Sequence, residues 1–258
     1  MMPTSPRMVK VPSIGILSLA LLIALPGFCK SKHPKQAATT QDSAASTNNT
    51  TATGVGSLEQ VLHSMDANAT KFRTAQADFV WTPYNSVINE TETPDKGKIY
   101  FRKAGNEIQM GATIQPPDDR QIVFAGGKVQ VFQPKTKVVD VYDATAHKDE
   151  VESFLVLGFG SSGQDLRKSF ELKYVGEEKI GDAQTGHLQL SPLAEQVKKS
   201  FPRIDLWIDS NGVSVRQQLF QTGGDYRLAD YSHIRVNDKV PDGAFKIKTS
   251  GPTKTVNH

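Results

Sequence analysis

The feature that most constrains this chain is a long series of short segments in which apolar and polar residues alternate, from about residue 77 to the C-terminal region. Alternation with a period of two is typical of β-strands that bury one face, and turn sequences such as AGGK, QPKTK and DSNG separate the segments. A single antiparallel sheet of about a dozen strands must curl strongly. The predicted strands are Ala77–Thr82, Gly97–Arg102, Glu107–Gly111, Gln121–Phe124, Val129–Phe132, Val138–Tyr142, Phe170–Val175, Thr185–Leu190, Ile204–Ile208, Val215–Gln221, Tyr226–Val236 and Ala244–Ile247.

A helix is predicted immediately before the strands, in the segment SLEQVLHSMDANATKF. Ser57 is a suitable N-cap, and Gln60 three residues later completes a capping-box pattern. Apolar residues recur at helical spacing, which predicts that one face of the helix is buried. These residues are Leu58, Val61, Leu62 and Met65.

A second helical segment interrupts the strands near the middle of the chain, in VESFLVLGFG, and a short helix is predicted over Gln164–Ser169. The concave face of a curled sheet would stay wet and apolar unless another element covered it, and this insertion is the natural cover. The predicted fold class is therefore mainly β (α+β). We expect a single curled antiparallel sheet that forms an incomplete barrel, covered by the N-terminal helix and a central helical lid.

The N-terminal region predicts export from the cytoplasm. Arg7 and Lys10 precede an apolar run from Ile14 to Leu25, which is too short to span a membrane and typical of a secretory signal. The only cysteine, Cys29, follows this run and is a candidate lipidation site, or it is removed with the leader. We expect a signal peptide over 1–29, a polar low-complexity linker over 30–56, and one folded domain over 57–258.

Composition and motifs argue against several other classes of function. The net charge of +3, from 30 basic and 27 acidic residues, does not favour nucleic-acid binding. With one cysteine and scattered histidines, no metal site or cofactor is predicted. GFGSSG does not fit the hydrolase motif G-x-S-x-G, and Asp118 and Asp119 in PPDDR are better explained by a polar turn than by a catalytic pair. No catalytic residue is predicted.

The order of segments resembles the LolA/LolB family of lipoprotein carriers over nearly all of residues 57–256. The family's opening helix and strand are similar to FRTAQADFVW, its next strand to GKIYFRKAG, and its proline-led hairpin to PPDDRQIVFAGGKVQVFQPKTKVVDVYD. Its helical lid is matched by VESFLVLGFG, and its ending by VPDGAFKIKTSGP.

This resemblance implies a non-enzymatic monomer that binds acyl chains of lipoproteins or other lipids in an apolar cavity. The protein would be periplasmic, and anchored to the outer membrane if Cys29 is lipidated. It would act as a soluble carrier or as an outer-membrane acceptor, and its partners would be an inner-membrane exporter and an outer-membrane acceptor. The alternative is an envelope sensor or scaffold domain that binds a lipid or protein tail without transferring it.

The expected apolar cavity and lid determine the candidate site residues. The apolar cavity wall is predicted to consist of Phe79, Trp81, Ile99, Phe101, Phe124, Phe132, Trp207 and Phe220. The lid is predicted to contribute Phe154, Leu155 and Leu157. The resemblance also implies a basic latch that holds the lid shut, for which Arg102 and Lys103 are the candidates.

Overall fold

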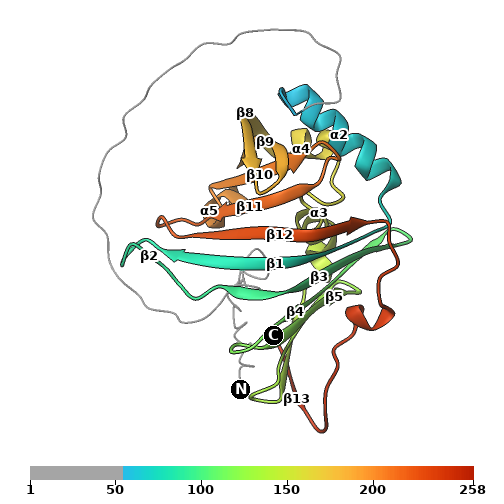
Figure 1. Cartoon of the computed structure of the whole chain (residues 1–258). Helices are drawn as coiled ribbons and strands as arrows, with labels where there is room; N and C mark the ends of the chain where they lie inside the picture. The colour runs from blue at the N-terminus through green and yellow to red at the C-terminus, as the bar shows by residue number, and fades with distance from the viewer. Residues whose placement is uncertain (1–54) are drawn as a thin grey trace, which may run out of the picture.

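The computed structural model describes residues 55–258, which form one curled, non-closed sheet with a few helices (Figure 1). The signal peptide, Cys29 and nearly all of the predicted linker lie outside the described residues. The strands are β1 (Thr74–Asn85), β2 (Glu90–Thr91), β3 (Asp95–Ala104), β4 (Glu107–Ile114), β5 (Arg120–Ala125), β6 (Lys128–Gln133), β7 (Val138–Asp143), β8 (Phe170–Ile180), β9 (Ala183–Pro192), β10 (Arg203–Asp209), β11 (Ser214–Phe220), β12 (Tyr226–Val236) and β13 (Lys254–Asn257).

The sheet has 13 strands in the order β13-β7-β6-β5-β4-β3-β1-β12-β11-β10-β9-β8, and β2 pairs with β1. The pairings are antiparallel except for β13, which runs parallel to β7. Two meanders, β3–β7 and β8–β12, therefore meet where β1 lies between β3 and β12. Figure 1 shows the strong twist between these halves, as expected for an open sheet of this size.

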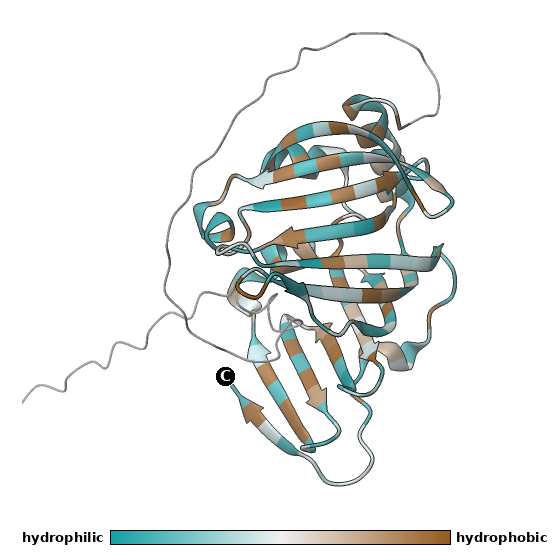
Figure 2. Ribbon diagram, turned by 60° about the vertical axis from the view of Figure 1, so that its left-hand side comes forward, coloured by the Kyte–Doolittle hydropathy of each residue, from teal (hydrophilic) through white to brown (hydrophobic). Residues whose placement is uncertain are grey.

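Alternation along the strands separates an inner face from an outer face, and Figure 2 shows the alternating hydrophobic and hydrophilic bands. We define the inner face as the one that carries Phe79, Trp81 and Phe101. The burial of β1 alternates strictly from Ala75 to Trp81, which is the pattern of a strand with one covered face. The outer face carries Trp207 and Phe220.

The helices cover the inner face. They are α2 (Leu58–Lys71), α3 (Lys148–Leu155), α4 (Gly163–Ser169) and α5 (Glu195–Ser200). There are also two short 3₁₀ turns, η2 (Thr145–His147) and η3 (Asp242–Phe245), and η3 packs on the outer face of β4. Figure 1 shows α2 and α4 beside β8–β10 and α3 behind β11 and β12. The N-cap predicted for α2 is confirmed, because the Ser57 hydroxyl accepts a hydrogen bond from the Gln60 N–H at 3.3 Å.

The hydrophobic core has two parts on this face. One lies under α2 and α4 against β9 and β10 and contains Val61, Leu62, Met65, Leu166, Leu188, Leu190, Ile204 and Leu206. The other lies against β1 and β3–β6 and contains Phe79, Trp81, Ile99, Phe101, Met110, Ile122, Phe124 and Phe159. The residues that follow α3 contribute to both parts, so the central helical segment joins the two halves of the core.

The C-terminal segment differs from the prediction. The predicted strand Ala244–Ile247 is instead the 3₁₀ turn η3 followed by extended chain, and the last strand is β13, ten residues later. Gly111 explains the position of η3: an added Cβ would lie 1.9 Å from the carbonyl oxygen of Ala244, so the segment packs directly on the β4 backbone. The helix α5 was not predicted.

Candidate functional site

An apolar pocket of about 100 Å³ lies between the inner face of the sheet and the central helical segment. We call it the inner pocket. Its sheet side comes from β1, β3, β4, β11 and β12, and its other side comes from α3 and the turn after it. It is lined by Trp81, Ile99, Phe101, Met110, Phe154, Leu155, Phe159, Gln217, Leu219, Arg227, Ala229 and Tyr231.

Strand register explains why these residues meet. Trp81 lies opposite Ala229 of β12, and Ala229 lies opposite Gln217 of β11. Phe101 lies opposite Met110 of β4 in the same way. Side chains at paired positions share one face, so the lining follows from the pairing of β11, β12, β1, β3 and β4.

Residues 148–162, which we call the lid, close the inner pocket. Leu155 packs against the β1–β6 part of the core, and Phe154 packs against the β9–β10 part, with its ring 5.7 Å from that of Phe201. Phe159 is almost completely buried, with its ring 5.0 Å from Phe101 and 4.9 Å from Tyr231. The lid therefore closes the pocket with its own apolar side chains.

Three consecutive carbonyl groups of the lid accept hydrogen bonds from the body of the domain. The Gln217 side chain donates from Nε2 to the Leu157 oxygen at 2.7 Å, and the Ser214 N–H donates to the Gly158 oxygen at 2.7 Å. Asn68 of α2 donates from Nδ2 to the Phe159 oxygen at 2.6 Å. The Tyr231 hydroxyl donates to Oε1 of Gln217 at 3.2 Å and orients this amide. These bonds hold the C-terminal end of the lid, and the helix α3 depends mainly on apolar packing.

The predicted latch residues do not contact the lid, which corrects that prediction. Arg102 points to the outer face, where it bonds to Gln109 and Asp242 and lies 4.3 Å above the ring of Phe245. Lys103 is exposed, and its backbone N–H bonds to the Arg73 oxygen at 2.7 Å. Arg102 lies on the outer face because Phe101 occupies the inner face and successive residues alternate. Its contacts with Asp242 and Phe245 hold the C-terminal segment there.

A second and larger hollow, of about 680 Å³, lies on the other side of the lid, and we call it the lateral groove. It runs between the lid, α4, and the segment joining β9 to α5. Its apolar lining consists of Val151, Phe154, Val156, Leu157, Leu166, Phe170, Pro192, Leu193, Ala194, Val197 and Phe201. Phe154 lines both the groove and the inner pocket, so a single side chain separates the two spaces at this point.

The structure brings together five of the predicted site residues around the inner pocket: Trp81, Ile99, Phe101, Phe154 and Leu155. Phe79 and Phe124 share the inner face but are packed in the core, and Leu157 lines the lateral groove. Phe132, Trp207 and Phe220 lie on the outer face, because they are paired with Gln121, Arg216 and Arg203 respectively. We therefore do not retain these three as cavity residues.

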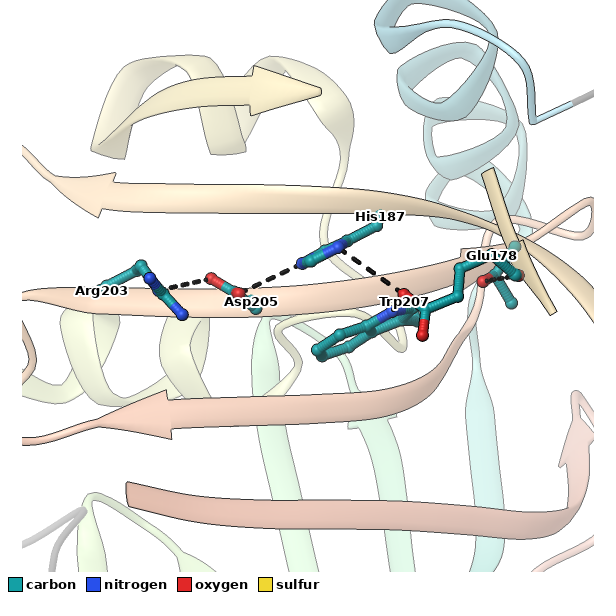
Figure 3. A network of polar contacts seen from close by, with 6 residues as sticks. Glu178, His187, Arg203, Asp205 and Trp207 are labelled. Atoms are coloured by element: carbon teal, nitrogen blue, oxygen red, sulfur yellow. Dashed lines mark hydrogen bonds and ion pairs between the residues drawn. The ribbon is translucent and has the colours of Figure 1, made fainter. Parts of the chain in front are cut away.

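Trp207 belongs to a polar network on the outer face instead (Figure 3). Its indole N–H donates to Glu178 at 2.6 Å, and its ring stacks on His187 at 4.2 Å. His187 contacts Asp205 at 3.1 Å, and Asp205 lies 3.1 Å from Nε of Arg203. The network covers the outer face of β9 and β10 with paired charges. Asp118 is exposed and Asp119 is half-buried in the β4–β5 turn, far along the sheet from this network.

Sequence reasoning missed seven residues of the inner pocket: Met110, Phe159, Gln217, Leu219, Arg227, Ala229 and Tyr231. Counting by twos along β4 could have found Met110, which shares the parity of Ile108, Ala112 and Ile114. The same count fails for Ala229 and Tyr231, because Arg227 and His233 have their parity on β12. Gln217 and Arg227 carry no such signal, because polar residues at alternate positions usually predict a solvated face.

Glu152 of the lid is a buried carboxyl group, 7% exposed, with Lys148 at 3.6 Å. Burial raises its pKa, and the Glu107 carboxylate adds to this effect, while the Ile108 backbone N–H and Lys148 oppose it. A raised pKa in the folded state means that the ionised form destabilises the fold. The cost is fully present above the folded pKa and disappears as the pH falls toward the unfolded value of 4.5.

We expect Glu152→Gln to raise the melting temperature near pH 8, with the gain shrinking toward pH 4.5. Thermal unfolding at several pH values measures this. Glu150→Gln is the matched control, because the Glu150 side chain is 69% exposed on the same helix. A gain that is independent of pH, or equal in both variants, would show that the Glu152 charge does not destabilise the lid.

No helix among residues 55–258 is both long and apolar enough to cross a membrane. Within the same range, histidine, cysteine and acidic residues do not gather in groups of three or more that could hold a metal ion.

Comparison with known proteins identifies the family. The family described as "Outer membrane lipoprotein carrier protein LolA" matches residues 70–248, which is more than half of the chain. The search of curated proteins found no match to this sequence.

Solved structures are similar at low sequence identity. An uncharacterized conserved protein from Thermus thermophilus matches with a TM-score of 0.49 and 11% identity, over 78% of this chain and 98% of that one. Lipoprotein LppX from Mycobacterium tuberculosis matches with a TM-score of 0.41 and 15% identity, over 71% and 98%. The Pseudomonas aeruginosa MucA/MucB complex matches with a TM-score of 0.44 and 12% identity, over 72% of this chain and 60% of that one.

Proposed function

Since this chain belongs to the LolA family, we propose that it binds acyl chains of lipoproteins or other lipids between the inner face of its sheet and the lid. The protein works in the periplasm without catalysis, as a carrier or as an acceptor anchored through Cys29. The observation that carries the proposal is the inner pocket, an apolar space closed by the apolar side chains of a separate helical segment.

The lid must move for a lipid to bind. The inner pocket of about 100 Å³ is several times smaller than a typical ligand pocket, so a lipid tail does not fit in the closed form. Displacing Phe154 would join this space to the lateral groove of about 680 Å³, because Phe154 lines both. A volume of several hundred Å³ is typical of ligand pockets.

The free energies make such an opening feasible. Burying an acyl chain of about sixteen carbons gains on the order of 10 kcal/mol, at about 0.8 kcal/mol per methylene. Exposing Phe154 and Leu155 costs roughly 1.5–3 kcal/mol each, and each lost hydrogen bond to the lid costs about 1 kcal/mol. A lipid tail can therefore replace the lid side chains with a net gain.

Native mass spectrometry of protein purified without detergent tests the proposal. We expect adducts with the mass of a phospholipid or an acylated peptide, and we expect Leu155→Glu to remove them, because a carboxylate would then face the apolar pocket. Val175→Glu is the control, since Val175 is 51% exposed on β8 and lines neither space. A mass without adducts, even after incubation with lipid, would contradict the proposal.

Transfer of the bound lipid to acceptor vesicles distinguishes a carrier from a sensor or scaffold domain of the same fold. Carriage requires the lipid to move to the vesicles, whereas a sensor would retain it.

A further inference from the structure

One of the three groups that donate to the lid carbonyls, the side-chain amide of Gln217, also lines the inner pocket. Gln217 is 8% exposed, and most of the other lining residues are apolar or aromatic. Its nitrogen donates to the Leu157 oxygen at 2.7 Å, and its oxygen accepts from the Tyr231 hydroxyl at 3.2 Å. Because a backbone carbonyl can accept but not donate, the N–H end of this amide must face the lid. The pocket therefore has a hydrogen-bond donor at the point where the sheet meets the lid.

The other two donors belong to residues that do not line the inner pocket. They are the Ser214 N–H and the Asn68 side chain, which bond at 2.7 and 2.6 Å. Their acceptors are the oxygens of Gly158 and Phe159 respectively. A tail that enters the pocket can therefore meet the Gln217 bond while the other two bonds stay in place.

Displacing Phe154 is expected to break the Gln217 bond first. The Leu157 N–H donates to the Phe154 oxygen at 3.2 Å, which connects Leu157 to the C-terminal end of α3. When the Leu157 oxygen moves away with α3, the Gln217 N–H is buried beneath the lipid tail without an acceptor. A buried donor without a partner is costly. Opening of the lid is therefore favoured when the ligand brings an acceptor of its own.

On the basis of the proposed function, we infer that Gln217 binds the carbonyl group that links an acyl chain to its lipid, and that this group replaces the Leu157 oxygen when the lid opens. Both acceptors are neutral carbonyl oxygens, so the exchange keeps the Gln217 amide paired. The tail then lies against the apolar lining near Phe101 and Met110. The preferred ligands are lipids whose chains are attached through a carbonyl, and alkyl ethers and hydrocarbons bind less tightly.

Isothermal titration calorimetry with two lysophospholipids that differ in this group tests the inference. Dodecanoyl lysophosphatidylcholine carries an ester carbonyl, and its dodecyl ether analogue has a methylene group in the same position. We expect the wild type to bind the ester about 5- to 100-fold more tightly than the ether, the range that corresponds to one buried donor left unpaired. Gln217→Met, which has a side chain of similar length without the amide, should bind both ligands equally.

Infrared spectroscopy of the bound ester gives a readout that a change in stability alone would not produce. With ¹³C in the ester carbonyl, its stretching band should lie at lower wavenumber in the wild type than in Gln217→Met, because the carbonyl accepts a hydrogen bond in the wild type. Gln218→Met is the matched control. Gln218 is the next residue on β11 and lies on the outer face, paired with Asp205. This variant should keep both the ester preference and the position of the band.

The outcomes separate this inference from the function on which it depends. If the wild type binds ester and ether equally, or if Gln217→Met keeps the preference, the carbonyl site is wrong and lipid binding stands. An ester band at the same wavenumber in both proteins would also overturn the site. If neither ligand binds to the wild type, both proposals are wrong. The comparison of the two ligands in the wild type decides the question even if Gln217→Met does not fold.

Discussion

Replacing Phe159 with alanine is expected to lower the free energy of unfolding by about 3–5 kcal/mol and, in the same protein, to increase lipid binding. Phe159 of the lid is 1% exposed and packs between Phe101 and Tyr231 of the sheet. Its removal leaves a cavity that adjoins the inner pocket, so the space that a tail can enter becomes larger. Urea unfolding gives the first quantity, and dodecanoate titration gives the second.

Phe124→Ala is the matched control for this experiment. Phe124 is completely buried in the same part of the core but does not line the inner pocket. We expect a similar loss of stability without any increase in lipid binding. If the two variants gained lipid affinity equally, general loosening of the core would explain the gain, and Phe159 would not be the side chain that closes the pocket.

Gly111→Val is expected to detach the C-terminal segment from β4 and to cost about 3–6 kcal/mol, the value of two exposed apolar side chains. The Cβ of any larger residue would lie 1.9 Å from the Ala244 carbonyl oxygen, which is backbone and cannot rotate away. Val240 and Phe245 are 7% and 5% exposed on either side of Ala244, and we expect both to become exposed when the segment detaches. Urea unfolding measures the loss, and hydrogen exchange locates it.

The expected exchange pattern is specific to this segment. Residues 239–250 should exchange faster in Gly111→Val, and the lid should keep its protection. Thr113→Val is the control, because Thr113 lies on the same face of β4 but is exposed. Unchanged stability and exchange in Gly111→Val would mean that the segment does not pack on β4 as described.

Much of the architecture could be predicted from the sequence. Alternating apolar residues predicted the strands of both meanders, and the helical spacing after Ser57 predicted α2 with its cap. The C-terminal end was less predictable, because β13 has four residues and is held by parallel pairing with β7, which leaves no local pattern. Ala244–Ile247 was wrongly predicted as a strand, because the packing on Gly111 that fixes the conformation of η3 is a contact that local sequence does not reveal.

The site was harder to predict than the fold. Trp207 was placed in the cavity wall as an aromatic strand residue, although Ile204, Leu206 and Ile208 define the buried parity of β10 and exclude it. Trp207 is buried on the outer face because charged and aromatic neighbours cover it, an effect that strand periodicity does not reveal.

The positions of two polar residues in the site also could not be predicted from the sequence. Gln217 and Arg227 face an apolar pocket, and their roles depend on what they meet across the sheet. Gln217 bonds to the lid through Leu157, 60 residues earlier in the chain. Because such contacts are set by tertiary packing, a single sequence predicts the strand and not the partner.

Quenching of tryptophan fluorescence by a fatty acid brominated near the end of its chain tests the central claim most directly, because the two tryptophans lie on opposite faces of the sheet. Trp81 lines the inner pocket, and Trp207 lies in the outer-face network. In Trp207→Phe, where Trp81 remains, the brominated chain should quench the fluorescence strongly and saturably. In Trp81→Phe, where Trp207 remains, it should cause little quenching. Quenching of Trp207 alone, or of neither, would contradict an acyl-chain site between the inner face and the lid.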